Sequence, residues 1–344
     1  MAPLTETRIM SRILAGVLAA LLAVPAAAQT VDWKFNNNYA PTRPESGHVR
    51  NFAADLDKRT NGRFKITVIE GGAMNLRDAD ALRWMQAGTP EIAFNWPPFL
   101  GRDAPDLANL YVYGSVSTAE EHLKALPTVE AILTEGFNRW KIGVAGFMGL
   151  PIIDATLFCR QPVRNLDELK RVKLRVGTRE QVDTFKALGV AAQIVPQNEL
   201  YAALQTGVVD CALYAARFAQ SVSLQEVAKH ATYTGFPFPP IPYVIMVNQA
   251  KYAALPADLK AALAEATAAL KVASSDFSKD AAAEKDARGK LAAAGVTWHP
   301  DLPAADQEAI RKAAQATWKA IATESGAQAV AYRERILKAL GRAD

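Results

Sequence analysis

Short strand-like and helix-like segments alternate along most of this 344-residue chain, and that alternation constrains the fold more than any other feature. In segment 63–69, apolar residues occupy every second position, as in a half-buried strand. In segment 46–59 they follow helical spacing up to a stop at Asn61-Gly62. The same order of elements recurs after about residue 154, so the sequence predicts an α/β protein with mostly parallel sheets. A chain of this length exceeds one ordinary domain, and we expect two lobes.

The C-terminal part of the sequence is mostly helical and follows a proline-rich segment. Residues 236–242 contain four prolines and predict a linker, in which Phe236 and Phe238 are expected to pack structurally. A strand is predicted over 243–248, and helical spacing then predicts one very long helix, Pro256–Asp286. The other predicted elements outside the alternating part are a strand at 296–299 and helices at 118–126, 128–138, 303–321 and 326–340.

The first 28 residues have the pattern of a secretory signal. Arg8 and Arg12 precede an unbroken apolar run over 13–24, and the small residues Ala26-Ala27-Ala28 predict cleavage before Gln29. The run is shorter than the ~20 apolar residues that a membrane-spanning helix needs. The sequence therefore predicts export across an inner membrane and a periplasmic location for the mature protein.

Charge and motif content exclude several classes of function. The formal net charge of +4 is small for this length, which argues against a nucleic-acid-binding protein. The sequence contains no G-x-S-x-G, H-E-x-x-H or Walker motif, and its four histidines are scattered. We therefore expect no enzyme activity, no cofactor and no metal site. An exported hydrolase of α/β fold is the alternative from a different class.

Cys159 and Cys211 are the two cysteines of the chain. Both lie in apolar, strand-like segments, and an exported protein enters an oxidising compartment that permits disulfides. One disulfide and two separate buried thiols are both compatible with this pattern, and neither cysteine has the surroundings of a nucleophile.

A single arginine stands between Leu174 and Val176 in the strand-like segment Val172–Val176. An unpaired guanidinium is too costly to leave in an apolar wall, so Arg175 needs an anionic partner. Its forked set of donors matches a carboxylate, which accepts two hydrogen bonds at once. We therefore expect a protein that captures a small organic acid. The structural alternative pairs Arg175 with a neighbouring Asp or Glu on a surface strand.

Several short strings, taken in order, resemble the solute-binding proteins of tripartite ATP-independent periplasmic (TRAP) transporters, of the DctP type. They are Thr60-Asn61-Gly62-Arg63-Phe64-Lys65-Ile66, Leu82 to Gly88, Leu166-Asp167-Glu168-Leu169, Lys173-Leu174-Arg175-Val176 and the block Glu199–Asp210. The resemblance covers essentially the whole mature chain. It implies a bilobed periplasmic-binding-protein fold, with a cleft between two α/β lobes and a long C-terminal helix that braces both.

The resemblance also implies a mechanism and a partner. Lobe I would contain residues 29–152 plus about 240–279, and lobe II residues 153–239 plus about 280–344. The chain crossings near Leu150 and Pro240 would act as the hinge on which the lobes close. Arg175 would form a two-pronged salt bridge with the ligand carboxylate, and the closed form would dock on TRAP membrane permease subunits. We expect the protein to be a monomer.

A second ligand-facing arginine, which the family often has upstream of the first, is missing here. Asp154-Ala155 occupy that stretch, and the nearest arginine, Arg160, is displaced by several residues. A monocarboxylate ligand is therefore favoured over one with two acidic ends. Asp154 either faces the cleft and accepts a hydrogen bond from the ligand, or it forms a turn at the start of a strand.

Two further candidates come from the second lobe. Tyr214 stands where the family often has an asparagine that touches the ligand. A tyrosine there either offers the ligand one hydrogen bond and a flat apolar face or packs in the core. Thr178 either donates its hydroxyl to the ligand or caps the helix that follows it.

Polar and aromatic residues also follow two predicted strands of the first lobe. Asn37, Asn38 and Tyr39 end one strand, and Asn95 and Trp96 end another. Ligands of open α/β sheets bind outside the carboxyl ends of strands, so we expect these residues to face the cleft. Trp96 either closes over an apolar ligand body or forms a hydrophobic plug under a loop.

Overall fold

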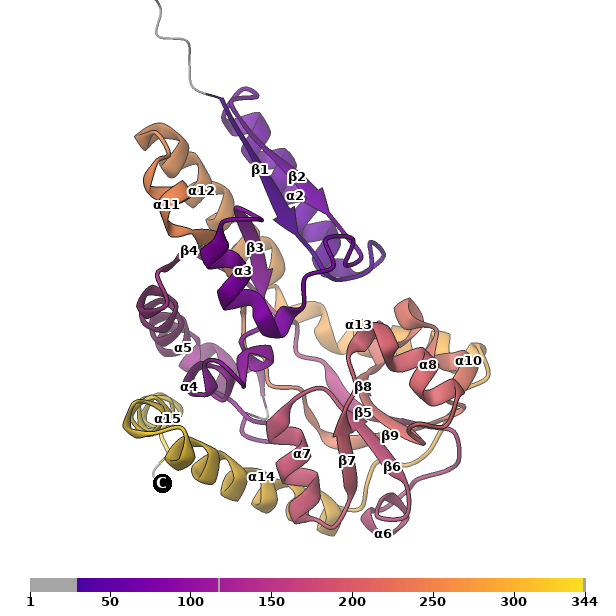
Figure 1. The fold of residues 1–344 in the computed structure, drawn as a ribbon. Helices are drawn as coiled ribbons and strands as arrows, with labels where there is room; N and C mark the ends of the chain where they lie inside the picture. The colour runs from indigo at the N-terminus through magenta and orange to yellow at the C-terminus, as the bar shows by residue number, and fades with distance from the viewer. Residues whose placement is uncertain (1–29, 117, 343–344) are drawn as a thin grey trace, which may run out of the picture.

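The computed structural model describes residues 30–116 and 118–342, which form two mixed sheets covered by helices (Figure 1). The strands of the first sheet are β1 Val31–Asn36, β2 Phe64–Ile69, β3 Ile92–Asn95, β4 Ile142–Met148 and β10 Tyr243–Asn248. Their order across the sheet is β2-β1-β3-β10-β4. β1 pairs in parallel with β2 and β3, whereas β10 runs antiparallel between β3 and β4. β10 therefore completes the first sheet although it follows the strands β5–β9 of the second sheet in the sequence.

The strands of the second sheet are β5 Asp154–Cys159, β6 Lys173–Val176, β7 Ala191–Ile194, β8 Cys211–Ala215, β9 His230–Pro237 and β11 Thr297–Trp298. Their order is β11-β9-β5-β8-β6-β7, and β5 runs antiparallel to both β8 and β9. The sheets are therefore mixed rather than mostly parallel. β9 is an addition to the predicted strands, because Gly235 and Pro237 give its end the composition of a linker.

Helices cover both faces of each sheet (Figure 1). The helices of the described residues are α2 Pro44–Arg59, α3 Ala81–Ala87, α4 Pro105–Ala108, α5 Ala119–Arg139, α6 Leu166–Leu169, α7 Arg179–Ala187, α8 Leu200–Gln205, α9 Ala216–Ala219, α10 Leu224–Val227, α11 Gln249–Ala253, α12 Ala257–Ser274, α13 Asp280–Ala293, α14 Ala304–Glu324 and α15 Ala327–Leu340. On the first sheet, α2 and α12 cover one face, and α3 and α5 cover the other. On the second sheet, α7 and α14 lie opposite α8, α9 and α13.

Strand periodicity explains why each sheet has two cores. On β10, Val244 and Met246 join the cluster under α3 and α5, whereas Tyr243, Ile245 and Val247 join the cluster under α2 and α12. Successive side chains of a strand point to opposite faces, so a continuous apolar run marks a strand buried on both sides. Each sheet is thus the centre of one lobe, and the predicted lobe boundaries stay a prediction.

The predicted single helix over 256–286 is wrong, because the chain breaks into α12 and α13 with a 3₁₀ turn, Phe277–Lys279, between them. At the break, Ser274 Oγ donates to Leu270 O and accepts from Gly149 N, and Asp276 accepts from Ser278 N. Such short polar side chains bond to nearby backbone groups and compete with the helix. The break lies where the chain passes from the first lobe to the second.

The predicted boundary at Pro127 is also wrong, since α5 continues through this proline as one helix. The carbonyl that a residue at 127 would have bonded belongs to Leu123, whose side chain is exposed. Proline interrupts the hydrogen-bond ladder, but a carbonyl freed on an exposed helix face can be hydrated.

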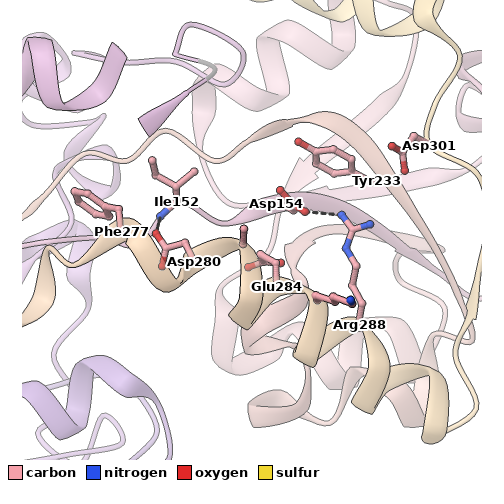
Figure 2. Close-up of a pocket in the computed structure, with 10 residues that line it drawn as sticks. Ile152, Asp154, Tyr233, Phe277, Asp280, Glu284, Arg288 and Asp301 are labelled. Carbon is pink, nitrogen blue, oxygen red and sulfur yellow. Dashed lines mark hydrogen bonds and ion pairs between the residues drawn. The ribbon is translucent and has the colours of Figure 1, made fainter. Parts of the chain in front are cut away.

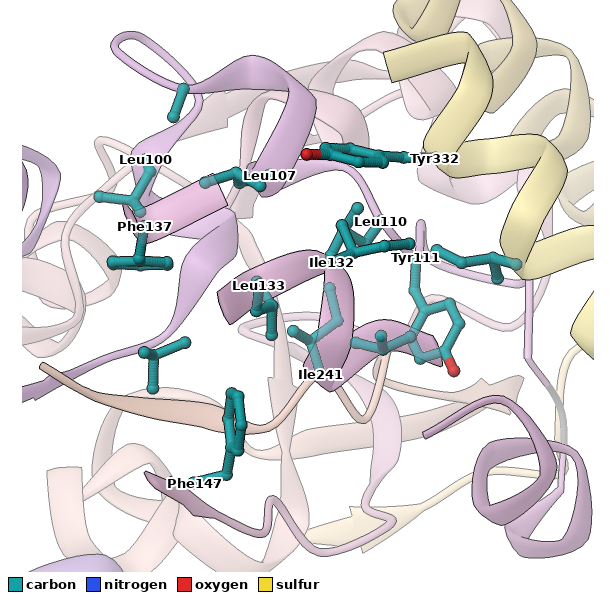
Figure 3. Close-up of a cluster of buried hydrophobic side chains, with 14 of the residues drawn as sticks. Leu100, Leu107, Leu110, Tyr111, Ile132, Leu133, Phe137, Phe147, Ile241 and Tyr332 are labelled. Atoms are coloured by element: carbon teal, nitrogen blue, oxygen red, sulfur yellow. The ribbon is translucent and has the colours of Figure 1, made fainter. Parts of the chain in front are cut away.

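The last helix departs from its predicted lobe. α15 packs along α5, and Tyr332, Ile336 and Leu337 join the hydrophobic cluster of the first lobe (Figure 3). The prediction places residues 280–344 in the second lobe, whereas α15 packs on the helices of the first sheet. α14 lies against α7 of the second lobe, so the α14–α15 pair connects the two lobes.

The two cysteines form a disulfide, Cys159–Cys211, which settles the alternatives left open by the sequence. They face each other on the paired strands β5 and β8. The predicted signal segment lies outside the described residues. Within the part of the chain that the structure describes, none of the helices has the length and apolarity required to span a membrane.

Candidate functional site between the lobes

A cavity lies between the two sheets, where residues of both lobes and of the chain crossings meet. It is lined by Tyr39, Arg43, Trp96, Phe99, Leu150, Ile153, Arg175, Gly177, Gln181, Gln197, Tyr214, Ala215, Phe218, Phe238 and Tyr243. Its volume is about 80 Å³. The lobes touch across it, because Arg43 Nη1 in the first lobe donates to Gln197 Oε1 in the second over 3.0 Å.

Arg175 enters this cavity from the middle of β6. Its neighbours Leu174 and Val176 point to the core beneath α7, and strand alternation turns Arg175 to the opposite face. The side chain is 94% buried, since its relative exposure is 6%. Its Nε donates to Val195 O over 2.9 Å, and its Nη1 donates to Leu213 O over 3.3 Å.

These carbonyl partners position the guanidinium without neutralising it. Among the described residues, no Asp or Glu forms an ion pair with Arg175, so the sequence-based alternative of a neighbouring acid does not hold. Burial lowers the pKa of Arg175 to about 10, and the nearby Tyr214 opposes that shift. The side chain is still charged at neutral pH, so the cavity contains a desolvated cation in need of an anion.

A second arginine, Arg43, lines the cavity but has its own carboxylate. Its guanidinium donates to both oxygens of Glu45, and Tyr243 Oη donates to the same carboxylate. Burial disfavours both charges, yet Arg43 holds the pKa of Glu45 below its usual value and Glu45 raises that of Arg43. The guanidinium carbon lies 4.1 Å from the ring centre of Tyr39 and 4.0 Å from that of Phe218.

Aromatic side chains form the rest of the wall. The Tyr214 ring centre lies 5.8 Å from the Arg175 guanidinium, and its buried hydroxyl makes no hydrogen bond of good geometry within the described residues. Trp96 stands edge-on to Phe99 and donates its indole N–H to Ile241 O in the chain crossing near Pro240. Phe238 also reaches the cavity from that crossing. The cavity is therefore lined mainly by aromatic rings, with the Arg175 guanidinium as its unneutralised charge.

The structure brings four of the predicted site residues to the cavity: Arg175, Tyr214, Tyr39 and Trp96. Asn38 lies elsewhere and donates to Leu76 O and Asp78 Oδ1. Asn95 is buried beside it and donates to Asp78 O. These asparagines follow strand ends as predicted, but they fix the loop before α3 instead of lining the cavity.

Thr178 and Asp154 also lie outside the cavity. Thr178 occupies the N-cap position of α7, yet its hydroxyl donates to Glu180 Oε1 instead of capping the helix. Asp154 pairs with Arg288 and lines a different cavity, of about 590 Å³, on the other side of the chain crossing. Asp154 therefore does not line the interlobe cavity in this structure, because Ile153 occupies that side of the extended chain.

Arg43, Gln197 and Phe218 are site residues that the sequence analysis missed. The signal for Arg43 is its place between Pro41 and Pro44 directly after a strand end, since a charged residue held by two prolines at such an edge is well placed for a cleft. Gln197 and Phe218 have no comparable signal, because only the meeting of the two lobes brings them to the cavity.

Comparison with known proteins identifies the family of this chain. The model of the bacterial extracellular solute-binding proteins, family 7 (DctP), matches residues 35–325. The chain belongs to this family. It is 26% identical over 333 residues to the C4-dicarboxylate-binding periplasmic protein DctP of Rhodobacter capsulatus, an alignment that covers 92% of this chain and 94% of that protein. The resemblance found in the sequence is confirmed.

Solved structures confirm the fold of this DctP-family protein. A TRAP periplasmic solute-binding protein from Desulfovibrio salexigens with bound orotic acid superposes with a TM-score of 0.81 at 20% identity, covering 91% of this chain and 99% of that one. A marine metagenome TRAP solute-binding protein specific for pyroglutamate gives a TM-score of 0.79 at 20% identity, covering 90% and 99%. The predicted bilobed fold is therefore correct.

Proposed function

We propose that this protein binds a small organic acid with one carboxylate in the interlobe cavity and delivers it to a TRAP-type membrane permease. One observation carries the proposal: Arg175 is buried in the cavity wall and hydrogen-bonded only to backbone carbonyls. A ligand carboxylate would accept from the guanidinium and neutralise it. The closed arrangement of the lobes would then be stabilised by as much as the ligand prefers it over the open one.

Charge pairing supports a monocarboxylate. Two arginines line the cavity, but Glu45 already neutralises Arg43, and only Arg175 is left without an anion among the described residues. A second acidic group on the ligand would have to be buried without a free cation, which is costly. The orotic acid and pyroglutamate bound by the two fold relatives each carry one carboxylate on a ring.

The aromatic wall indicates the shape of the ligand body. Tyr39, Trp96, Tyr214 and Phe238 surround the charged corner, so a planar or apolar body would bury its surface against them. The free Tyr214 hydroxyl would donate to a hydroxyl, keto or ring oxygen near the carboxylate.

The remaining parts of the proposal concern location and activity. We propose that the predicted signal segment is cleaved, that the mature protein is a periplasmic monomer and that it does not turn its ligand over. The hydrolase alternative receives no support from the family, whose members are solute-binding proteins. Incubation with simple esters and peptides should give no product.

A matched screen of acids tests the proposal. Thermal unfolding of the purified mature protein should be followed with monocarboxylates and with dicarboxylates of the same chain length, such as butyrate with succinate. Ring-bearing monocarboxylates, including orotate and pyroglutamate, should raise the melting temperature most, because a ligand that binds only the folded state stabilises it more the more tightly it binds. Stabilisation by dicarboxylates alone, or by uncharged amides equally well, would refute the single-carboxylate site.

A further inference from the structure

The second cavity, which is lined by Asp154 and Arg288 and is called the hinge cavity, lies on the other side of the chain crossing near Leu150. Its volume is about 590 Å³, within the ~300–1,000 Å³ typical of small-molecule sites. One face of α13 forms its floor, with Asp280, Glu284 and Arg288 one turn apart (Figure 2). Asp154 at the start of β5 and Tyr233 of β9 stand opposite these residues (Figure 2).

Three of the six charged residues that line this cavity, Asp154, Asp280 and Arg288, are hydrogen-bonded to an opposite charge. Arg288 donates to Asp154, and its guanidinium also lies over the rings of Tyr233 and Trp298. Asp280 accepts from Arg217 Nη1 over 2.7 Å and from Ile152 N over 2.8 Å. The other charged residues in the lining, Lys285 and Asp301, are opposite in sign. These charges cancel, which leaves Glu284.

Glu284 is buried and has no hydrogen-bond partner on either carboxylate oxygen within the described residues. Its side chain is 8% exposed, and Arg217 Nε lies 3.9 Å from Oε1, beyond hydrogen-bond distance, while Nη1 of the same guanidinium donates to Asp280. Burial raises the pKa of Glu284 to about 8, with the Asp154 charge adding to that shift. A buried carboxyl group with no donor is unusual in native proteins and calls for a partner from outside the chain.

The hinge cavity adjoins the interlobe cavity through three consecutive residues. Ile152 and Asp154 face the hinge cavity, whereas Ile153 between them lines the interlobe cavity. The crossing between α12 and α13 contributes as well, because Phe277 and Asp280 lie at and just after the break between these helices. An occupant of the hinge cavity would therefore touch two of the segments at which the chain passes between the lobes.

We propose that the hinge cavity is a second binding site, for a small organic ammonium ion with an aromatic or apolar body. Both oxygens of Glu284 are covered in this structure, so the ammonium group would donate to them after the side chain turns towards the cavity. The body would lie against Ile152, Tyr233 and Phe277. Within the described residues, no three His, Cys, Asp or Glu side chains are grouped to hold a metal ion, so an organic cation fits the lining better. The aromatic rings would add cation–π attraction.

Calorimetry with 2-phenylethylammonium, and with 2-phenylethanol as its uncharged isostere, tests this site. The wild-type protein at pH 8.5 should bind one equivalent of the ammonium ion and none of the alcohol. Glu284→Gln should weaken binding at least about tenfold, since a charged hydrogen bond is lost. Arg175→Ala should bind the ammonium ion like the wild type, because that substitution changes the other cavity.

A second variant separates occupancy from folding. Ala281 lines the hinge cavity, and Ala281→Phe should block the ammonium ion while leaving Glu284 in place. Affinity in the wild type should also rise as the pH increases through about 8, because the bound cation displaces a proton from Glu284. The proposal is overturned if the wild type binds no ammonium ion, if Glu284→Gln binds it equally well, or if Arg175→Ala abolishes binding.

Discussion

The two cavities of this protein each contain one buried ionisable group that is not hydrogen-bonded to an opposite charge among the described residues. In the interlobe cavity it is Arg175, and in the hinge cavity it is Glu284. In both places neighbouring charges are hydrogen-bonded to each other, Arg43 to Glu45 and Arg288 to Asp154. Whether a buried charged residue is hydrogen-bonded to an opposite charge therefore indicates more about its function than its residue type does.

The two unpartnered groups respond to burial in different ways. Burial lowers the pKa of Arg175 to about 10, so it remains a cation at neutral pH. Burial raises the pKa of Glu284 to about 8, so this carboxyl can become neutral by binding a proton. The interlobe cavity thus always needs an anion, whereas the hinge cavity needs a cation only when Glu284 is ionised.

The largest expected effect is on ligand binding by Arg175→Ala. Removal of this guanidinium leaves a buried ligand carboxylate without a cation, and we expect affinity for the best acid of the screen to fall roughly 100-fold or more. Calorimetry measures the affinity, and the melting temperature should change little. Arg160→Ala, which changes an exposed arginine outside the cavity, is the matched control and should bind normally. An unaltered affinity in Arg175→Ala would remove the basis of the proposed function.

Glu45→Gln tests whether the ion pair with Glu45 is what makes Arg43 differ from Arg175 in the interlobe cavity. Arg43 would then be a second buried cation without a carboxylate, and we expect a loss of about 3 kcal/mol in the free energy of unfolding. Urea unfolding at pH 7 measures this. The control Glu70→Gln breaks the more exposed pair with Arg50 and should cost less than about 1 kcal/mol.

The same variant also bears on specificity. With Arg43 left unpaired, dicarboxylates should gain affinity relative to monocarboxylates of equal length. If Glu45→Gln is as stable as the wild type and its preference is unchanged, the comparison between Arg43 and Arg175 fails.

Sequence patterns located Arg175 because its signal is local. A lone cation between Leu174 and Val176 in a buried strand has to lie on the face opposite those residues, and that face proved to be the cavity. Asp154 shows the limit of the same reasoning. Its strand was predicted, but which side of the extended chain faced the cleft depended on the packing of α13 behind it.

The missed features share a dependence on distant contacts. Gln197 and Phe218 reach the cavity only because the lobes meet, and the pairing of Arg43 with Glu45 depends on a turn that composition does not specify. The break before α13 was missed because helical periodicity continues through Ser274 and Asp276, whose side chains bond to the backbone instead. Sequence periodicity thus predicted which faces of the strands and helices are buried. Tertiary contacts determine which residues pack against those faces, and the sequence pattern does not contain them.

Glu284→Gln should sharpen the contrast between the cavities through stability. The pKa of Glu284 is about 8 in the folded protein, against an ordinary value of 4.5, so between these pH values the folded state binds a proton that the unfolded state does not. This contribution to stability is complete below pH 4.5 and is lost as the pH rises through 8. Glutamine does not titrate, so the variant does not lose this stability as the pH rises. Between pH 5 and pH 9 we expect its free energy of unfolding to increase by on the order of 2 kcal/mol relative to that of the wild type.

Urea unfolding at both pH values measures the gain. Glu120→Gln, an exposed substitution, should give the same difference from the wild type at both. Stability curves of Glu284→Gln and the wild type that run parallel with pH would mean that Glu284 has a partner in solution.

The smallest expected effect is the pH dependence of acid binding, and it discriminates between the cavities most directly. Burial raises the pKa of Asp78 to about 6 and that of Glu180 to about 7, and these groups interact with Tyr39 and Gln181 of the interlobe cavity. Both are therefore mostly ionised at pH 7.5. Arg175 stays charged up to about pH 10. Calorimetric affinity for the acid should therefore change less than about twofold between pH 7.5 and pH 9 and should fall above pH 10, when the guanidinium begins to lose its proton. A change of acid affinity centred near pH 8 would instead show that Glu284 acts on the interlobe cavity through Ile152, Ile153 and Asp154, so that the two sites would have to be treated as one coupled system.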